Sequence, residues 1–376
     1  MPTLSVIVDE MLSTAPSGVA RYTEELARAL IETAPAGCDV EALVAASSQS
    51  ARALLAERLP GLAGIRSNRL DRRQLRGAWQ HGFTRLTAGM VHAPSPFAPL
   101  SRHERASHAG GQQIVVTVHD TLAWTHPESL SAADASWARA MVARAARYAD
   151  AVVVPTHAVA DALAGVGSFG ERIRVIGGAV SDRLVEPADA AARRAGLALP
   201  ARYLVALGDL SAGKALDRTL DALAQLGDDA LPLVLVGVSG AAIVAVQDAA
   251  RDAGLPTGRV VPLGVLEDAD YAAVIAGAVA LVHPSVDEGF GLVVLEAMRL
   301  GVPVVHADTP AVLEVAGDAG LVVPASEGSR ALADALAALT TDAVLADSLR
   351  VLGRDRAGLF SWARSAEKVW QLHADL

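Results

Sequence analysis

The sequence predicts an α/β protein with two doubly wound domains that face one another across a cleft. Three observations support this prediction. The chain has 376 residues, which is longer than a single compact core normally holds. Short apolar, β-branched runs alternate with alanine-rich helical stretches along its whole length. Those runs are almost continuously apolar, as is typical of parallel strands that are covered by helices on both faces.

Twelve apolar runs, each bounded by turn residues, are expected to form strands. Those of the first half are residues 4–10, 40–46, 89–93, 113–120, 151–156 and 173–178. Those of the second half are residues 202–209, 231–237, 259–264, 279–285, 302–308 and 320–323. Each half therefore has enough strands for its own sheet. The polar, proline-containing stretch 180–201 suits a linker, which predicts a first domain over 1–180 and a second that begins at 181.

Composition and charge exclude several classes of protein. The formal net charge of −10 disfavours a non-specific nucleic-acid binder, which depends on clustered lysine and arginine. The single cysteine, Cys38, excludes an internal disulfide framework and a cysteine-based zinc site. The N-terminus lacks the basic and apolar segments of a signal peptide, and no apolar run is long enough to span a membrane. A cytoplasmic location is therefore expected.

Unusual loops follow four of the predicted strands. Gly18 opens a helix after the first strand, and His119-Asp120 end the strand at 113–120. Gly208 follows the strand at 202–209, with Lys214 a few residues later, and residues 287–291 follow the strand at 279–285. Ligands of open parallel sheets bind at the carboxyl ends of the strands. Two loops from each half therefore predict one ligand site between the domains.

The Gly-Phe-Gly corner of the last loop indicates an anion site. Gly289 and Gly291 remove side chains where the loop enters a helix, so backbone N–H groups can approach a pyrophosphate. Glu288 and Glu296 flank this corner, and a phosphate would repel them. We therefore expect both carboxylates to accept hydrogen bonds from neighbouring hydroxyl groups, one set from a sugar and the other from a ribose. The pattern predicts a sugar nucleotide as ligand.

Residues 284–304, PSVDEGFGLVVLEAMRLGVPV, resemble the E-x7-E signature of the retaining, metal-independent GT-B glycosyltransferases of family 4. Other segments are similar to that family as well: GVARYTEEL at 18–26, VTVHD at 116–120 and LEVAGDAG at 313–320. FSWARSAEKVW at 360–370 resembles the segment where the family's chain returns to its first domain. The resemblance implies two Rossmann-like domains, a donor domain over 181–355 and a C-terminal helix over 356–376.

The resemblance also implies roles for individual residues. Glu288 would contact the transferred sugar, and Glu296 would bind the ribose. Lys214 would pair with the diphosphate, His119 would face the donor sugar, and Gly18 would let the first domain approach the phosphates. The remaining residues expected in the donor site are Gly208, Gly289, Phe290, Gly291 and Leu292. Asp120 and Glu314 have no role that the sequence decides, and His92 and His283 are interpreted as core histidines.

One position departs from the family pattern. An arginine usually stands near the lysine, but Asp209 and Gly213 occupy those positions here. Loss of a guanidinium from a diphosphate site removes a charge-assisted hydrogen bond, worth roughly 1.5 to 3 kcal/mol. Arg21 and Arg218 are the candidates to replace it.

Residues 65–86 combine five arginines with Leu75, Trp79, Phe83 and Leu86 on one helical face. We interpret the segment as a helix that packs this face on the first domain. A peripheral contact with the inner face of a membrane, or with a lipid-linked acceptor, is the alternative hypothesis.

The predicted function is transfer of a hexose, with retention, from a GDP- or UDP-linked sugar to a glycan, lipid-linked or small-molecule acceptor. GDP-mannose is the first candidate donor. The expected catalytic residues are Glu288, His119 and Lys214, with no metal and no nucleic-acid partner. A sugar phosphorylase, a nucleotide-sugar epimerase and a non-catalytic partner subunit are alternatives, because fold alone does not decide function.

Overall fold

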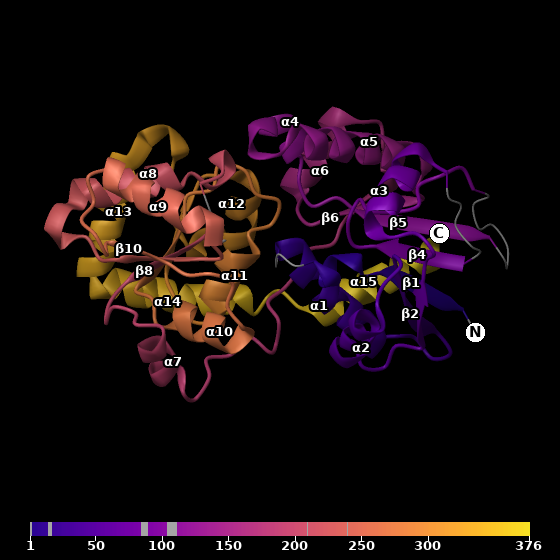
Figure 1. Cartoon of the computed structure of the whole chain (residues 1–376), viewed down its shortest axis with the longest axis horizontal. Coiled ribbons are helices and arrows are strands. Elements are labelled where there is room, and N and C mark those ends of the chain that lie inside the picture. Colours follow the sequence, from indigo (N-terminus) through magenta and orange to yellow (C-terminus); the bar gives the residue numbers. More distant parts are fainter. Residues whose placement is uncertain (1, 14–16, 84–88, 104–110, 209, 239) are drawn as a thin grey trace. The chain divides into compact units, whose positions relative to one another are not determined.

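The structure is a computed structural model that describes residues 2–13, 17–83, 89–103, 111–208, 210–238 and 240–376. The chain forms two compact units, shown in Figure 1. Unit 1 consists of residues up to Gly178 together with Ser361–Leu376, and unit 2 is Ala179–Phe360. The chain therefore passes from one unit to the other twice.

Unit 1 is built on a seven-stranded sheet in the order β3-β2-β1-β4-β5-β6-β7. Every pair of neighbouring strands is parallel. The carboxyl ends of all seven strands therefore lie at one edge of the sheet. The strands are β1 (Thr3–Ile7), β2 (Asp39–Val44), β3 (Gly64–Ser67), β4 (Gly89–Ala93), β5 (Gln112–Thr117), β6 (Ala151–Val154) and β7 (Ile173–Val175).

Helices cover both faces of this sheet (Figure 1). One face packs against α3, α5 and α6 through a core that includes Leu75, Trp79 and Met141. On the other face α1 lies against α15, the last helix of the chain. The helices of unit 1 are α1 (Gly18–Glu32), α2 (Gln49–Arg58), α3 (Arg72–His81), α4 (Leu122–Thr125), α5 (Ala132–Tyr148), α6 (His157–Val166) and α15 (Trp362–Asp375).

Unit 2 is built on a six-stranded parallel sheet in the order β10-β9-β8-β11-β12-β13. Its central strands are buried on both sides because their residues alternate between two separate apolar cores. The strands are β8 (Leu204–Leu207), β9 (Leu233–Val236), β10 (Val260–Pro262), β11 (Ala280–His283), β12 (Val304–Ala307) and β13 (Leu321–Val323).

The two cores of unit 2 lie under two layers of helices (Figure 1). One core joins the sheet to α8, α9, α13 and the first part of α14. The other joins it to α10, α11 and α12. The helices are α7 (Ala190–Gly196), α8 (Leu216–Leu226), α9 (Gly240–Asp252), α10 (Asp268–Ala276), α11 (Leu292–Arg299), α12 (Pro310–Ala316), α13 (Gly328–Thr341) and α14 (Ala343–Ala357).

The predicted α/β class with two doubly wound domains is confirmed, and each of the twelve apolar runs contains a strand. Strand β3, at the edge of the unit 1 sheet, was not among the predicted strands. Its sequence GIRS has no apolar run, and its last two residues are exposed. Residues 65–67 therefore belong to a strand, and the helix of the 65–86 segment begins only at Arg72.

The C-terminal helix α15 is attached to unit 1 by polar contacts as well as apolar packing. Ser365 Oγ donates to the carbonyl of Gly177 at 2.6 Å, and Trp370 Nε1 donates to the carbonyl of Leu30 at 3.2 Å. His373 Nδ1 lies 3.2 Å from Gln113 Oε1 in β5. These bonds supplement the burial of Ala366, Val369 and Leu372 on the sheet face that α1 also covers.

Two buried histidines face one another between α15 and the sheet. His92 in β4 and His373 in α15 have ring centroids 5.7 Å apart and are 0% and 3% exposed. Burial lowers the pKa of His92 well below its ordinary value, and the nearby His373 lowers it further. Burial also lowers the pKa of His373 to about 4, although Asp150 acts in the opposite direction. Both rings are therefore neutral at pH 7 in the folded chain.

We expect unit 1 to lose stability between pH 6.5 and about 4. The unfolded chain binds a proton at His373 near pH 6.5 and the folded chain only near 4, so acid favours unfolding by up to about 3 kcal/mol at this residue. His373→Gln should reduce the loss, measured as the melting temperature from pH 7.5 to 4. His81→Gln, at an exposed position, is the control. Equal pH dependence in wild type and His373→Gln would contradict this account.

Candidate active site

The central strands of unit 2 place two sequence-predicted residues together. β8 and β11 are neighbours, and the chain continues from β8 toward one edge of the sheet and from β11 toward the other. Such a switch in strand order opens a crevice at the carboxyl ends, where ligands of open α/β sheets bind. Lys214 follows β8, and Glu288 follows β11. The two loops are joined by a hydrogen bond from Val286 N to the carbonyl of Gly213 at 3.1 Å.

Lys214 and Glu288 form an ion pair across this switch point. Lys214 Nζ lies 3.0 Å from Glu288 Oε2, and the side chains are 36% and 23% exposed. His283, the last residue of β11, brings Nε2 to 3.5 Å from the same carboxylate oxygen. The structure therefore joins the predicted cation and the predicted sugar-contacting acid, although 74 residues separate them in sequence.

The electrostatics keep Glu288 ionised. Burial acts to raise the pKa of its carboxyl group, but the His283 side chain and the positive charge of Lys214 outweigh burial and hold the pKa at about 2. A carboxylate that stays charged across the physiological range can accept hydrogen bonds from hydroxyl groups but cannot donate one. This behaviour suits a residue that binds a sugar rather than a general acid.

Two glycines of the predicted site have a steric reason. Gly208 has φ +122°, and a Cβ built on it would lie 3.1 Å from Cγ of Lys214, so the lysine side chain passes close over this backbone. Gly291 has φ +78° and precedes the first turn of α11. Its added Cβ would lie 3.3 Å from Val312 Cγ2. Both positions favour glycine because a side chain is strained at such φ values.

Glu296, the second glutamate of the E-x7-E pattern, lies in a different environment. It is 2% exposed in α11, and its Oε2 accepts a hydrogen bond of 2.5 Å from the hydroxyl of Tyr271 in α10. Of the other predicted residues of this segment, Gly289 is buried and Leu292 is the first residue of α11. Phe290 packs its ring edge-on against Phe360 at 5.9 Å.

Arg218, the candidate in unit 2 to replace the missing guanidinium, makes other hydrogen bonds in the structure. Arg218 donates to the carbonyls of Val323, Pro324 and Gly328, so it ties α8 to the start of α13. Arg21 lies in the first turn of α1, in unit 1. Asp209 lies outside the described residues.

Apart from Glu314, the remaining predicted residues belong to unit 1. Gly18 is exposed at the start of α1, where Ser17 Oγ caps the helix by accepting from Ala20 N at 3.1 Å. A Cβ at Gly18 would meet nothing within 4 Å, so unit 1 alone does not require glycine there. Asp120 Oδ1 accepts from Leu122 N at 3.0 Å, which forms an Asx turn just before α4. Glu314 lies in α12 of unit 2.

His119 is held in one tautomer. Its Nε2 lies 2.7 Å from the carbonyl oxygen of Pro94, which can only accept, so Nε2 carries the proton and Nδ1 is left as an acceptor. Burial lowers the pKa of His119, while the carbonyl of Pro94 and the charge of Glu10 oppose that change. Tyr22 contacts the ring edge-on, with centroids 4.7 Å apart. His119 is therefore a neutral, oriented imidazole.

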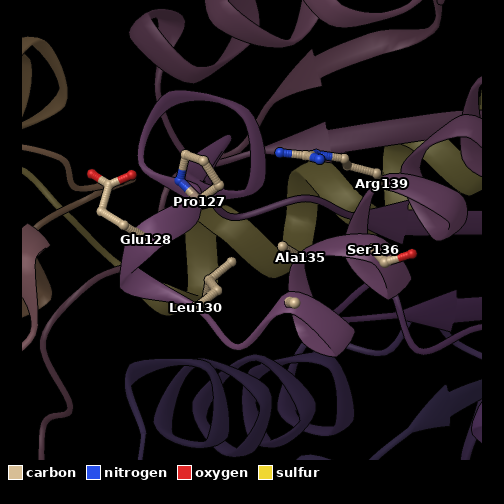
Figure 2. Close-up of a pocket in the computed structure, with 7 residues that line it drawn as sticks. Pro127, Glu128, Leu130, Ala135, Ser136 and Arg139 are labelled. Atoms are coloured by element: carbon tan, nitrogen blue, oxygen red, sulfur yellow. The ribbon is translucent and has the colours of Figure 1, made fainter.

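His119 also lines a cavity of about 340 Å³ that unit 1 forms at the carboxyl ends of β1, β4 and β5. We call this cavity the unit 1 pocket. Glu10, which follows β1, makes two polar contacts in this pocket. Ser95 Oγ donates to Glu10 Oε1 at 3.1 Å, and the Arg72 guanidinium lies 2.8 Å from Glu10 Oε2. A second, more open pocket of about 450 Å³ is lined by Pro127, Glu128, Leu130, Ala132, Ala135, Ser136 and Arg139 (Figure 2).

The basic segment 65–86 packs in part as the first interpretation expected, and Phe83 is a correction to it. Leu75 and Trp79 are buried on unit 1, and Arg72 and Arg76 pair with Glu10 and Asp134. Phe83 is 81% exposed, while Leu86 lies outside the described residues. Among the helices that the structure describes, none is long and apolar enough to cross a membrane. Within the same residues no group of three or more His, Cys, Asp or Glu suits a metal ion.

Sequence reasoning missed three residues that these sites contain. His283 was interpreted as a core histidine because it ends an apolar run, and its nearness to Glu288 depends on how the loop returns. No motif around Tyr271 or Glu10 indicates a site, since each residue meets its partner from another element. The only available signal for Glu10 was its place directly after a strand, at the edge where ligands bind.

We expect Lys214→Met to raise the pKa of the Glu288 carboxyl from about 2 toward its ordinary value of 4.5, because the neighbouring positive charge is removed. Carboxyl 13C NMR titration measures this change directly. Lys368→Met is a matched control, since Lys368 is the other of the chain's two lysines and is exposed in α15. A Glu288 pKa that stays at about 2 in Lys214→Met would contradict the ion pair.

Two family profiles match the chain, one in each half. The profile described as "Glycosyltransferase Family 4" matches residues 16–183, and the one described as "Glycosyl transferases group 1" matches residues 201–342. The first match lies mainly in unit 1 and the second lies within unit 2, so both units carry the sequence features of these enzymes.

Several curated relatives match parts of the chain, and two of them illustrate the range. O-antigen chain mannosyltransferase B of Escherichia coli is 40% identical over 104 residues, 27% of this chain and 26% of that protein. D-inositol 3-phosphate glycosyltransferase of Saccharomonospora viridis is 31% identical over 292 residues, 70% of this chain and 65% of that protein. The chain thus matches less than two thirds of the length of either relative.

A solved structure shares the fold over the whole chain. Anabaena HepE in complex with UDP and glucose has a TM-score of 0.75 and 20% sequence identity, and the match covers 100% of both chains. Its GT-B architecture agrees with the two Rossmann-like parallel sheets described above. This likeness shows the fold alone, while the two profile matches over residues 16–183 and 201–342 show that the chain belongs to the family 4, group 1 glycosyltransferases.

Proposed function

We propose that the chain transfers a hexose from a nucleoside diphosphate sugar to a hydroxyl group of an acceptor, with retention at the anomeric carbon. The observation that carries this proposal is the Lys214–Glu288 pair at the β8/β11 switch point, next to the start of α11. One cation and one permanently charged carboxylate there match a ligand that has a phosphate beside hydroxyl groups.

The diphosphate would take Lys214 away from Glu288. A diphosphate oxygen offers the ammonium group a stronger partner, and the N–H groups at the start of α11 add a positive helix end. Glu288, released from the lysine, would then accept hydrogen bonds from sugar hydroxyl groups. The close approach at Gly208 leaves the lysine a defined position from which to reach the phosphate.

Glu296 is proposed to bind the ribose. Its carboxylate accepts one hydrogen bond from Tyr271, and a carboxylate has lone pairs for several donors. A ribose hydroxyl would join Tyr271 as a second donor. Phe290, Gly289, Gly291 and Leu292 complete the proposed donor site through their backbone groups.

The transfer itself needs little acid-base chemistry from the protein. The bond between the anomeric carbon and the diphosphate oxygen breaks as the acceptor oxygen bonds to that carbon from the same face. The acceptor proton passes to the departing diphosphate oxygen, which balances the charge. Lys214 and the helix end stabilise the diphosphate as its charge grows. We propose that no divalent metal takes part.

Unit 1 would present the acceptor. His119 is proposed to face the transferred sugar with Nδ1 as an acceptor, because Nε2 is occupied by the Pro94 carbonyl. Gly18 is proposed to leave room for phosphate at the exposed start of α1. A lipid-linked acceptor would favour the membrane hypothesis. In that hypothesis the exposed side chains of Phe83, Arg69 and Arg73 would contact the membrane.

Two comparisons support different donors. The Escherichia coli relative is named a mannosyltransferase, which supports mannose, whereas the structural neighbour holds UDP and glucose. GDP-mannose is the first candidate and UDP-glucose the second.

Binding of the donor should protect Lys214 from an amine-acylating reagent. The chain has only two lysines, so Lys368 serves as an internal standard within the same molecule. We expect GDP-mannose or UDP-glucose to slow acylation of Lys214 at least fivefold and to leave Lys368 unchanged, as measured by peptide mass spectrometry. Equal rates with and without every nucleotide sugar of a panel would exclude a donor site at this lysine.

Glu288→Gln should lower kcat about a hundredfold because the amide cannot replace a charged acceptor at the sugar hydroxyls. The free energy of unfolding should fall by no more than about 3 kcal/mol, which is the most that a pKa of about 2 in place of 4.5 contributes, so the variant should remain folded. Release of nucleotide, measured in EDTA, gives the rate, and urea unfolding gives the stability. Glu327→Gln, at an exposed position of unit 2, is the control. Wild-type turnover in Glu288→Gln would show that the site is misassigned.

A further inference from the structure

The unit 1 pocket contains polar groups that the proposed transfer does not use. Glu10 and Ser95 enter it from the ends of β1 and β4, which flank the switch point of the unit 1 sheet. Arg72 and Arg76 come from α3, and Asp134 comes from α5. A ligand site is expected at such a switch point. The question is which chemical class of ligand these groups select.

The formal charge of the lining is negative. Its charged residues are three acids, Glu10, Asp120 and Asp134, against two arginines, Arg72 and Arg76, which leaves a net charge of −1. The lowered pKa keeps His119 neutral at pH 7, so it does not alter this balance. A phosphorylated or carboxylated ligand would therefore enter against the field of the pocket.

Neither arginine is an open anion site. The Arg72 guanidinium lies 2.8 Å from Glu10 Oε2 and also 4.9 Å from the ring centroid of Phe97. The Arg76 guanidinium lies 2.6 Å from Asp134 Oδ1 and 4.5 Å from the ring centroid of Trp137. Each guanidinium meets its carboxylate through one nitrogen, so an anion bound to its other N–H groups would lie beside that carboxylate and be repelled by it.

The same ion pairs suit hydroxyl groups. A sugar hydroxyl donates one hydrogen bond and accepts others, so it can bridge a guanidinium N–H and a carboxylate oxygen without breaking their pair. Ser95 adds a further uncharged partner. Trp124 and Trp137 are half-buried in the lining and offer apolar ring surface to the C–H groups of a sugar.

We propose that the unit 1 pocket binds an uncharged sugar of the acceptor and selects against acceptors that carry a phosphate at this sugar. This inference rests on the proposed function, because it assigns the acceptor of that transfer. The volume of about 340 Å³ is near the lower end of the roughly 300–1,000 Å³ range of small-molecule sites.

The second pocket shares one lining residue, Leu130, with the unit 1 pocket. In this proposal a chain longer than one sugar would continue past Leu130 toward Glu128 and Arg139. Figure 2 shows these two side chains spread along the lining, with Pro127 between them. Neutral disaccharides should therefore bind more tightly than the corresponding monosaccharides.

Saturation-transfer NMR on the full chain, in the presence of UDP or GDP, tests the proposal. The probes are methyl α-mannoside, methyl α-mannobioside, myo-inositol and myo-inositol 3-phosphate. We expect the neutral glycosides to bind, the disaccharide at least threefold more tightly, and myo-inositol to bind at least tenfold more tightly than its phosphate. Tighter binding of the phosphate than of myo-inositol overturns the proposal, as does the absence of binding by every neutral probe.

Glu10→Gln tests the cause of the selectivity. The substitution brings the charge of the lining to zero and releases Arg72, so binding of the neutral glycosides should weaken at least tenfold while myo-inositol 3-phosphate gains measurable binding. A gain of binding cannot come from misfolding. Glu57→Gln, at an exposed position of α2, should keep the wild-type order of the probes. An unchanged preference in Glu10→Gln overturns the proposal.

Donor binding on the same samples separates this inference from the proposed function. A melting temperature that rises with a nucleotide sugar shows that the donor site works, whatever the acceptor result. Donor binding together with a preference for phosphorylated probes would sink only the acceptor inference. No response to any donor would sink the proposed function itself.

Discussion

Parallel pairing of every strand is the constraint on which both units depend. A parallel strand must be followed by a crossover, and the crossovers here cover both faces of each sheet with helices. All strands of a sheet then end at one edge. Residues that are far apart in sequence meet at that edge, as Lys214 and Glu288 do in unit 2 and Glu10 and Ser95 do in unit 1. The chemistry of each unit is therefore concentrated in its loops, while the strands supply the core.

Each site keeps its charged side chains paired within its own unit. The ammonium of Lys214 is neutralised by Glu288, and the guanidinium groups of Arg72 and Arg76 are neutralised by Glu10 and Asp134. Pairing lowers the cost of partly burying a charge in a crevice. It also sets the terms on which a ligand binds. In the proposed function a diphosphate replaces one carboxylate in unit 2, whereas the hydroxyl groups of the proposed acceptor join the pairs in unit 1 without separating them.

Sequence patterns predicted the architecture well because burial on both faces leaves a strong local signal. Twelve of the strands lie within apolar runs, and the one that was missed, β3, is an edge strand of sequence GIRS with two exposed residues. An edge strand pairs on one side only, so it does not need a continuous apolar sequence. The Gly-Phe-Gly corner was equally readable, because the positive φ of Gly291 leaves few alternatives to glycine.

Pairings within the sites were harder to predict. The sequence identified Glu288 and Lys214 as separate candidates, but the contact between them depends on β8 and β11 being neighbours. Glu296 was predicted as a ribose-binding acid, but its burial against Tyr271 is a contact between two helices that the spacing of the motif does not contain. Arg218 has the positive charge that a diphosphate site needs, but its guanidinium already donates to three backbone carbonyls.

The double passage of the chain between the units bears on the order in which they are completed during synthesis. Unit 2 is one continuous segment, so all of it has left the ribosome before α15 does. Until then unit 1 lacks the helix that covers α1, and apolar side chains such as Leu26 and Leu30 lie next to an empty place on the sheet. Unit 1, which begins the chain, is thus completed last. A nascent chain stalled before residue 361 would expose to chaperones the apolar surface that α15 later covers.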